Sequence, residues 1–458
     1  LMGMVFAFSI PAVACATWSA GAARVCITPQ HSMWMAGYAA RTKPADGKLN
    51  DLWVRALVLD DGQHHRAVII SLDLVGIGRG FAQTLCEELK SSHGFERHQV
   101  ALCCSHTHSG PVVGDNLKPL HYAQLDAGHK QLVVQFAARL IPLVSQCVKQ
   151  AIDSTEPCKL AFGSGRCSVA VNRRWNREPD VALERDQDSL KGPVDHDVPV
   201  LTVRSADEQL KAVLFGYACH ATVLDGYQWS GDYPGFAQDE LETAHPGTVA
   251  MFWAGCGADQ NPLPRRRVEL AKLYGKQLAT SVEAVLDASM TPVQESLATR
   301  FEEIHLPFGR LPTEEELQKE SRSSNKYYAA RAQMLLDQIE DGKSLDATYP
   351  YGIGVWRLGN EIQFVFLGGE VVVDYAIRLK IELSNSQTWV AGYANDVMAY
   401  IPSRRVLREG GYEGAVAQIV FNLPGTWKAD LETKIIYEVL QLAEETGIEI
   451  PESILSTQ

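Results

Sequence analysis

Residues 53–75, WVRALVLDDGQHHRAVIISLDLV, contain two apolar runs separated by a short polar segment. Each run is rich in Val, Leu and Ile, the residues that pack well on a pleated surface. Asp60, Asp61 and Gly62 lie between the runs and favour a turn. The pattern therefore predicts a β-hairpin.

Helices and strands alternate irregularly on either side of this hairpin. Helical spacing of apolar residues predicts helices over 80–90, 132–152, 266–288, 312–339, 371–383 and 431–445. Apolar runs predict strands over 100–104, 159–171, 199–219, 249–253 and 388–394, and a second hairpin over 352–367. Because no internal repeat or low-complexity linker divides the chain, we expect one large α/β domain over 18–458.

The charge and the cysteines exclude some functional classes. Lys and Arg number 42 against 55 Asp and Glu, and the resulting net charge of -13 argues against a nucleic-acid-binding protein. The ten cysteines lack the spacing of a disulfide scaffold or of a CxxC zinc module. We expect them to be reduced thiols, most of them buried in apolar surroundings.

The amino-terminal residues 4–16, MVFAFSIPAVACA, have the length of the apolar region of a signal peptide. Ala14-Cys15-Ala16 resembles a cleavage site, although no Lys or Arg precedes the apolar run. We therefore expect residues 1–17 to form a signal-like segment and favour an exported protein over a cytoplasmic one. No other segment is judged to approach the ~20 apolar residues of a membrane span, so we expect a soluble or peripheral protein.

A pair of histidines gives the strongest chemical signal. Ser105–Pro111, SHTHSGP, follows a short apolar strand and places His106 and His108 two positions apart. The two imidazoles can face one site where the strand turns into a loop, and neutral imidazole is a common zinc ligand. The alternative is a pair of hydrogen-bonded loop histidines.

Two more side chains have the character of metal ligands. His220 ends an apolar strand, and Glu370 follows Gly368-Gly369 at a strand-to-helix turn. An unpaired carboxylate is costly to bury, and a metal ion would remove that cost. The alternatives are a structural histidine and a carboxylate stabilised by the amino end of a helix.

Five blocks, in the same order, resemble the neutral (non-lysosomal) ceramidases, a family of zinc-dependent amidases. The blocks are Ser105–Pro111, Asn172-Arg173, Ala218-Cys219-His220, Gly369-Glu370, and the pair Tyr400 and Tyr412, the latter within GYEGA. The resemblance runs from about Ser19 to about Ala415. It implies one catalytic domain of mixed β-sheets layered with helices.

The resemblance also implies roles for individual residues. The zinc ligands would be His106, His220, Glu370 and Tyr400, and the catalytic residues His108, Arg173 and Tyr412. Zinc would lower the pKa of a water molecule and polarise the substrate carbonyl. His108 would transfer the proton from that water to the leaving amine, while Arg173 and Tyr412 would donate to the developing oxyanion.

The implied reaction is ceramide N-deacylation, which gives a fatty acid and a sphingoid base from a lipid-like N-acyl substrate. Such an enzyme could make peripheral contact with a membrane or micelle, whereas no pattern predicts an oligomeric state. The alternatives are a zinc amidase, esterase or lactonase for another acyl substrate, and a non-catalytic zinc-stabilised lipid-binding protein. A deep apolar pocket would favour ceramide, and a shallow polar one smaller acyl amides or esters.

The chain departs from the family pattern at three places. Only residues 416–458 follow Ala415, so we expect the family's carboxy-terminal β-sandwich domain to be absent. Val112-Val113 replace small residues, and the segment between Asp259 and Glu370 is short. These changes leave the catalytic centre better supported than the ceramide specificity.

Two turn-rich segments, 231–235 and 255–262, contain Asp232 and Asp259. We expect both carboxylates to organise their loops by accepting hydrogen bonds from backbone N–H groups. The alternative is that they support the metal ligands from behind.

Overall fold

The computed structural model describes residues 17–448 and 450, so the apolar segment predicted at residues 4–16 lies outside it. The hairpin predicted from residues 53–75 is confirmed. Strands β3 (Trp53–Asp60) and β4 (Arg66–Leu72) pair antiparallel, with Asp60 opposite Arg66. The turn is closed by the Asp61 carboxylate, which accepts from the backbone N–H groups of Gln63 and His65.

This hairpin lies within a nine-stranded sheet of order β11-β9-β8-β6-β1-β3-β4-β5, with β13 beside β6. Its other strands are β1 (Ser19–Cys26), β5 (Val100–Cys104), β6 (Glu156–Arg166), β8 (Asp197–Ser205), β9 (Leu210–Tyr217), β11 (Val249–Ala254) and β13 (Thr291–Pro292). The pairs β4–β5 and β9–β11 are parallel, and all others are antiparallel. The sheet is therefore mixed, as expected.

A second sheet has the order β14-β15-β16-β18. It consists of β14 (Leu297–Pro307), β15 (Thr348–Leu358), β16 (Ile362–Leu367) and β18 (Gln387–Ala391). Strands β15 and β16 are the second predicted hairpin, which is confirmed, and Gly359 supplies the left-handed φ of 61° at its turn. The strand β14 was not predicted, because the charged residues of LATRFEEIHLP obscure its alternation.

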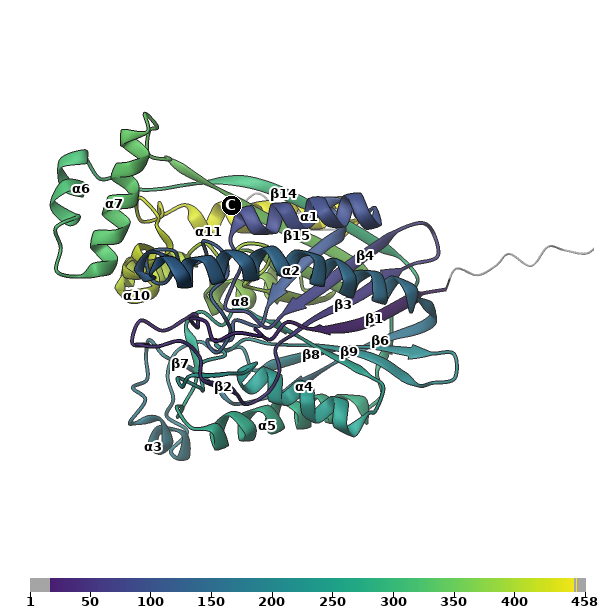
Figure 1. The fold of residues 1–458 in the computed structure, drawn as a ribbon. Coiled ribbons are helices and arrows are strands. Elements are labelled where there is room, and N and C mark those ends of the chain that lie inside the picture. The colour runs from purple at the N-terminus through teal and green to yellow at the C-terminus, as the bar shows by residue number, and fades with distance from the viewer. Residues whose placement is uncertain (1–16, 449, 451–458) are drawn as a thin grey trace, which may run out of the picture.

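Alternation along the strands explains how the sheets are stacked. Val54 and Val58 of β3 contribute to a core shared with helices, whereas Leu57 points to the opposite face. That face packs against Phe364 of β16 in the second sheet. Val365, the next residue of β16, points to the other face of the second sheet and belongs to a third core. The result is four layers, with two sheets between two layers of helices (Figure 1).

The helix layers flank the two sheets. Helices α1 (Arg79–His93), α2 (Ala127–Asp153), α4 (Asp232–Ala244) and α5 (Val268–Leu286) cover the large sheet, and α8 (Val373–Glu382) and α11 (Leu431–Glu445) cover the second. In Figure 1, α6 (Glu314–Glu320) and α7 (Lys326–Glu340) project from the upper left, away from the sheets. The fold-class prediction, mixed sheets layered with helices, is thereby confirmed.

Three segments that were each predicted as a single helix or strand form two separate elements in the structure. The single helix predicted over 312–339 is wrong, because the Asn325 side chain caps α7 by accepting from the Tyr327 N–H and so starts a new helix. The strand predicted over 159–171 is divided into β6 and β7, and the run 199–219 into β8 and β9.

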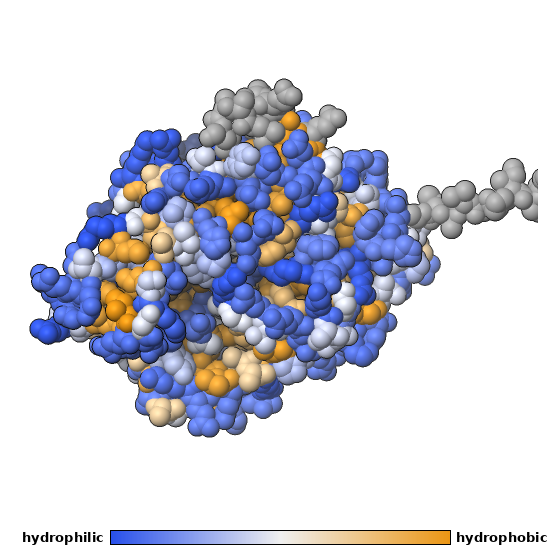
Figure 2. Space-filling model, turned by 90° about the horizontal axis from the view of Figure 1, so that it is seen from above, coloured by the Kyte–Doolittle hydropathy of each residue, from blue (hydrophilic) through white to orange (hydrophobic). Residues whose placement is uncertain are grey.

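The prediction that no other segment has the composition of a membrane span is wrong for α2, whose 27 residues are long and apolar enough to cross a membrane. The helix nevertheless packs against β1 and β3, and Val133, Leu140 and Val144 on one face are fully buried. One face of this apolar helix therefore belongs to the core. On the face shown in Figure 2, apolar residues form small patches among hydrophilic ones.

Short elements complete the part of the chain that the structure describes. They are β2 (Gly47–Lys48), β7 (Ala170–Asn172), β10 (Gln228–Trp229), β12 (Gln260–Pro262), β17 (Glu370–Val371), β19 (Tyr400–Ile401), α3 (Val181–Asp186), α9 (Arg404–Glu409) and α10 (Gly411–Gly414). β2 pairs with β10, β7 with β12, and β17 with β19. All nine cysteines among the described residues are free thiols, and eight of them are buried, as expected for reduced cysteines.

Candidate active site

Four of the predicted residues reach one site from separate elements. His106 follows β5, His220 follows β9, and Glu370 and Tyr400 lie in β17 and β19. Backbone hydrogen bonds join these segments: His108 N–H donates to the Ala221 carbonyl over 3.1 Å. Because the segments hold one another, the side chains are positioned before any substrate binds.

The tautomers of His106 and His220 follow from their backbone contacts. Nδ1 of His106 lies 2.6 Å from the Val75 carbonyl, and Nδ1 of His220 lies 2.7 Å from the Gly257 carbonyl. A carbonyl oxygen can only accept, so each Nδ1 carries the hydrogen and each Nε2 presents a lone pair. Such carbonyl contacts are the usual way in which metal-binding histidines are oriented.

Both lone pairs point at Glu370. Its Oε2 lies 3.3 Å from Nε2 of His106 and 3.1 Å from Nε2 of His220, and all three side chains are buried. The two Nε2 atoms and Oε2 are all acceptors, so no hydrogen lies between them. None of the described residues donates a hydrogen bond to Oε2. A divalent cation would satisfy all three atoms, and this set of nitrogen and oxygen donors suits zinc.

His108 belongs to the same cluster but is held differently. Its Nε2 lies 3.1 Å from Nε2 of His106, and ring nitrogens of His106, His108 and His220 lie within 4.8 Å of one another. Its Nδ1 is buried, and among the described residues it has no hydrogen-bond partner. Burial and the two neighbouring imidazoles lower the pKa of His108 well below its usual value.

The chain reaches His108 closely only because residue 37 is glycine. Gly37 has a φ of +96°, and a Cβ there would lie 2.3 Å from His108 Nδ1. Its N–H donates to Nε2 of His121 over 2.9 Å, which fixes the loop. Any side chain at this position would displace the His108 imidazole.

Tyr400, Arg173 and Tyr412 form the opposite wall. The Tyr400 hydroxyl lies 3.5 Å from His220 Nε2 and accepts a hydrogen bond of 3.1 Å from Arg173. The Tyr412 ring lies 5.3 Å from the Tyr400 ring and is half-exposed. Burial and the charge of Glu370 raise the pKa of Tyr412 to about 12, so its hydroxyl is protonated at neutral pH.

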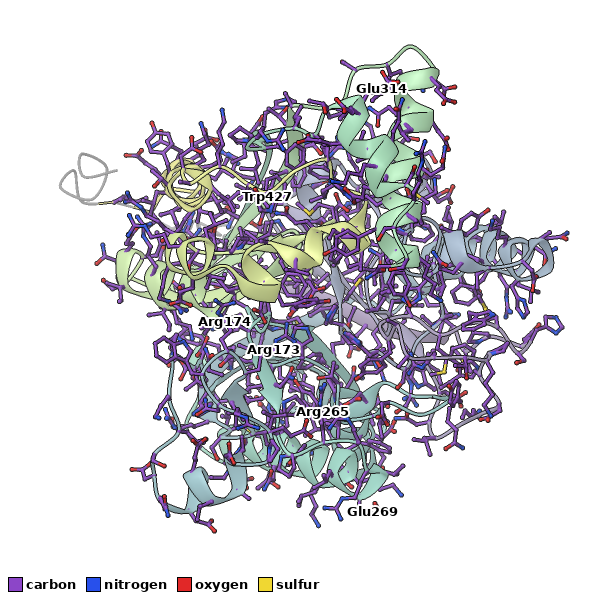
Figure 3. The ribbon with its side chains drawn as sticks, turned by 90° about the vertical axis from the view of Figure 1, so that its left-hand side faces the viewer. Arg173, Arg174, Arg265, Glu269, Glu314 and Trp427 are labelled. Carbon is purple, nitrogen blue, oxygen red and sulfur yellow. The ribbon has the colours of Figure 1, made fainter. Side chains whose placement is uncertain are left out.

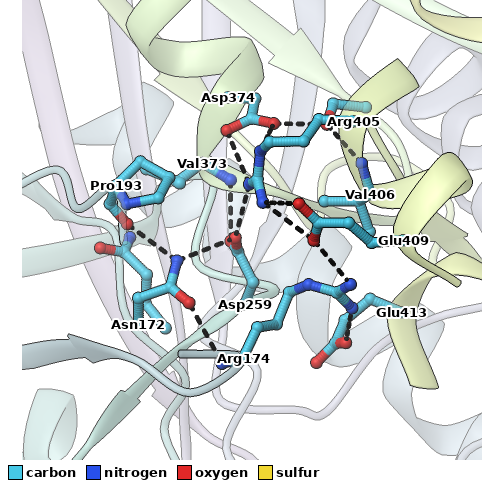
Figure 4. Close-up of polar contacts among 12 residues, drawn as sticks. Asn172, Arg174, Pro193, Asp259, Val373, Asp374, Arg405, Val406, Glu409 and Glu413 are labelled. Carbon is cyan, nitrogen blue, oxygen red and sulfur yellow. Dashed lines mark hydrogen bonds and ion pairs between the residues drawn. The ribbon is translucent and has the colours of Figure 1, made fainter. Parts of the chain in front are cut away.

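Ion pairs keep Arg173 in place. Its Nε donates to Glu413 over 2.8 Å, and Arg174 binds the other oxygen of the same carboxylate. Figure 4 shows that this network continues through Glu409 to Arg405. Although burial alone lowers it, the pKa of Arg173 is held well above its usual value by Tyr400 and Glu413, so the guanidinium stays charged.

The two aspartates organise the loops, as predicted. The Asp232 carboxylate accepts from the Val223 and Leu224 N–H groups over 3.2 and 2.9 Å, although Asp232 itself begins α4 rather than lying in a loop. Asp259 accepts from the Val373 N–H over 2.9 Å and so ties its loop to the start of α8 (Figure 4).

The sequence interpretation missed Tyr393, Tyr38 and Arg265. Tyr393 stacks on His106 with ring centroids 4.2 Å apart, and the Tyr38 ring lies 4.8 Å from that of His108. Arg265 lines the same pocket from the loop before α5. No motif in the sequence pointed to a site role for any of these three residues.

A pocket of about 550 Å³ opens onto the site. The predicted residues that line it are His108, Arg173, His220, Tyr400 and Tyr412. Most of its other side chains are polar, and no Val, Leu, Ile, Met or Phe is among the described residues that line it. The pocket is thus open and polar rather than a deep apolar cavity.

Residues 18–256 match the protein-family description "Neutral/alkaline non-lysosomal ceramidase, N-terminal". The chain is 25% identical over 261 residues to neutral ceramidase from Drosophila pseudoobscura pseudoobscura, an alignment covering 54% of this chain and 36% of that protein. It is 23% identical over 230 residues to neutral ceramidase from Pseudomonas aeruginosa, covering 48% and 33%. The alignments thus span about a third of the length of these relatives.

Solved structures share the fold. The crystal structure of neutral ceramidase from Pseudomonas aeruginosa matches with a TM-score of 0.72 at 18% identity, covering 94% of this chain and 75% of that chain. A structure described as ceramidase complexed with C2 has the same TM-score and covers 95% and 77%. At this identity the likeness concerns the fold alone.

Proposed function

This chain belongs to the neutral/alkaline non-lysosomal ceramidase family, and we propose that it hydrolyses the amide bond of an N-acylated substrate. In the family's reaction, ceramide is split into a fatty acid and a sphingoid base. One observation carries the proposal: the lone pairs of two oriented imidazoles converge with a carboxylate beside a charged arginine.

The proposed metal is zinc, with His106, His220, Glu370 and Tyr400 as its ligands. Two observations support this set. Oε2 of Glu370 has no hydrogen-bond donor, and the Nε2 lone pairs of His106 and His220 both point at it. A bound zinc ion supplies a Lewis acid that polarises the amide carbonyl and lowers the pKa of water.

His108 is the proposed general acid and base. Its Nε2 faces the ligand cluster, whereas its Nδ1 has no backbone carbonyl of the kind that orients the two proposed ligands. This difference favours proton transfer over metal ligation for His108. Its lowered pKa keeps the His108 imidazole neutral, so the ring can accept a proton from water and then give it to the leaving amine.

Arg173 and Tyr412 are the proposed donors to the carbonyl oxygen as that oxygen becomes negatively charged. Both line the pocket, and both carry their donor hydrogens at neutral pH. Preorganised donors of this kind usually contribute a large share of rate enhancement. A protein that only stores zinc would need none of these three side chains, so the arrangement disfavours a non-catalytic lipid-binding protein.

The pocket favours a second candidate substrate class. An open pocket with polar walls suits a smaller acyl amide or an ester better than a long-chain ceramide.

Export, predicted from residues 4–16, and peripheral contact with a membrane or micelle remain part of the proposal. Fractionation of cells that express the full chain tests the location.

The decisive experiment measures fatty-acid release from a short-chain fluorescent ceramide, an N-acyl amino acid and a simple ester. The purified protein is assayed as isolated, after treatment with a chelator, and after zinc is added back. Zinc-restored ceramide turnover would support both the chemistry and the family's substrate. Metal-dependent cleavage of only the other substrates would support the second candidate, and no cleavage by zinc-loaded protein would contradict an enzymatic role.

A further inference from the structure

Arg265 lines the candidate active-site pocket, and its guanidinium group has few hydrogen-bond partners. Its Nε is buried and lies 3.5 Å from Glu178 Oε2, without a hydrogen bond. Within residues 17–448, no side chain or carbonyl accepts from its terminal nitrogens, and the side chain is 21% exposed. A guanidinium group has five N–H donors, so Arg265 presents most of its hydrogen-bonding capacity unused.

The neighbouring arginines are all engaged. Arg173 and Arg174 share the Glu413 carboxylate. Arg266, the next residue along the chain from Arg265, donates to Glu178 over 2.7 Å and is half-exposed. Arg266 forms the hydrogen bond to Glu178, the acid that also lies in ion-pair distance of Arg265, so the terminal nitrogens of Arg265 are left to the pocket.

The pocket lining is positively charged although the protein is acidic. Arg173, Arg174 and Arg265 line the pocket with a single carboxylate, that of Glu413, in a chain whose net charge is -13. Figure 3 shows the three arginines near the centre of one face, with Glu269 well below them. A concave site with this local charge attracts anions.

We propose that Arg265 binds an anionic group of the substrate, so that the preferred substrate is an N-acyl amide bearing a carboxylate on its amine half, such as an N-acyl amino acid. This proposal rests on the amide hydrolysis proposed above and specifies the class of amide. The planar guanidinium pairs with a carboxylate through two parallel hydrogen bonds, whereas the sphingoid half of a ceramide carries no anionic group to pair with it.

The test uses two amides of the same size, N-hexanoylglycine and the neutral N-hexanoylglycinamide. The zinc-loaded protein is compared with Arg265→Gln, Arg265→Lys and the control Arg310→Gln. We expect the unaltered protein to prefer N-hexanoylglycine in kcat/KM. Arg265→Gln should lower the ratio of the two kcat/KM values at least tenfold through KM, Arg265→Lys should restore part of it, and Arg310→Gln, at an exposed position outside the pocket lining, should leave it unchanged.

Calorimetric binding of both amides decides the proposal even where neither is cleaved. Tighter binding of N-hexanoylglycine that weakens at least tenfold in Arg265→Gln supports it, and failure to cleave would then count only against the proposed hydrolysis. Equal affinity for the two amides, or equal losses for both in Arg265→Gln, would overturn it. Ceramide cleavage without any preference for the anionic amide would uphold the hydrolysis and refute the role of Arg265.

Discussion

Glu370 and Tyr400 lie directly opposite each other in the parallel pair β17–β19. The Glu370 N–H donates to the Ala399 carbonyl over 2.7 Å, which fixes their register. Paired positions in adjacent strands direct their side chains to the same face of a sheet. Glu370 and Tyr400, which lie in unrelated parts of the sequence, are thereby placed together beside the imidazoles of His106 and His220.

Glu370→Gln should weaken zinc binding. The amide keeps the shape of the side chain but loses the negative charge that faces His106 and His220. We expect zinc affinity to fall at least about tenfold and amidase activity about 100-fold. Zinc content after dialysis against a weak chelator measures the first effect, with the exposed Glu269→Gln as control. Full zinc content in Glu370→Gln would exclude Glu370 as a ligand.

Tyr400→Phe should have a milder effect on the metal. The phenol lies farther from His220 than Glu370 does, at 3.5 Å against 3.1 Å, and also accepts from Arg173. We expect roughly a tenfold loss of zinc affinity, with the free energy of unfolding changed by about 1 kcal/mol for the lost hydrogen bond. A zinc titration and a urea melt separate the two quantities. Unchanged zinc affinity would leave Tyr400 as a hydrogen-bond acceptor only.

Arg173→Ala should remove activity while the metal stays bound. Arg173 donates to Tyr400 and Glu413 and lies 3.4 Å from His220 Nε2, but among the described residues it forms no hydrogen bond with His106 or Glu370. Loss of an oxyanion donor typically costs 100-fold to 1,000-fold in kcat, and we expect a decrease of about that size. Arg173→Lys keeps the charge and should recover part of the rate. A variant that lost zinc in parallel with activity would argue for a structural role.

Asp396 should make stability depend on pH. Burial, opposed by the hydroxyl of Tyr349 and by Arg79, raises the pKa of Asp396 from 3.8 to about 7. Between these two values the folded protein binds a proton that the unfolded chain has released. The free energy of unfolding contributed by Asp396 therefore falls as the pH rises from about 4 to about 7.

Asp396→Asn should flatten this part of the pH profile, because the amide does not titrate. Urea melts at pH 4.5 and pH 7.5 measure the difference, and Asp207→Asn, in the exposed turn between β8 and β9, is the control. An unchanged pH profile in Asp396→Asn would contradict the raised pKa.

Phe364→Ala should destabilise the packing between the two sheets. Phe364 is fully buried, and its ring lies 4.2 Å from that of Phe366 and 4.9 Å from that of Trp253. Truncation of a buried phenylalanine costs about 3–5 kcal/mol of unfolding free energy. Chemical denaturation measures the loss, and Leu273→Ala at the exposed surface should cost less than about 0.5 kcal/mol. Similar values for the two variants would contradict the proposed packing.

Local sequence patterns were sufficient for most of the sheet framework. The hairpins over 53–75 and 352–367 were predictable because each strand is a continuous apolar run and each turn has its own polar or glycine residues. The strand β14 could not be predicted in this way, since Arg300, Glu302 and Glu303 place charged side chains on both of its faces and only pairing with β15 makes it a strand.

The sequence by itself determined the donor types of the site and their place at strand ends, because an apolar strand that ends in His106 or His220 is a local pattern. Only the tertiary structure decided that those imidazoles face Glu370, that Tyr400 pairs with it, and that Arg265 enters the same pocket. Side-chain direction at a strand end depends on loops held by distant backbone groups, and no local pattern encodes those contacts.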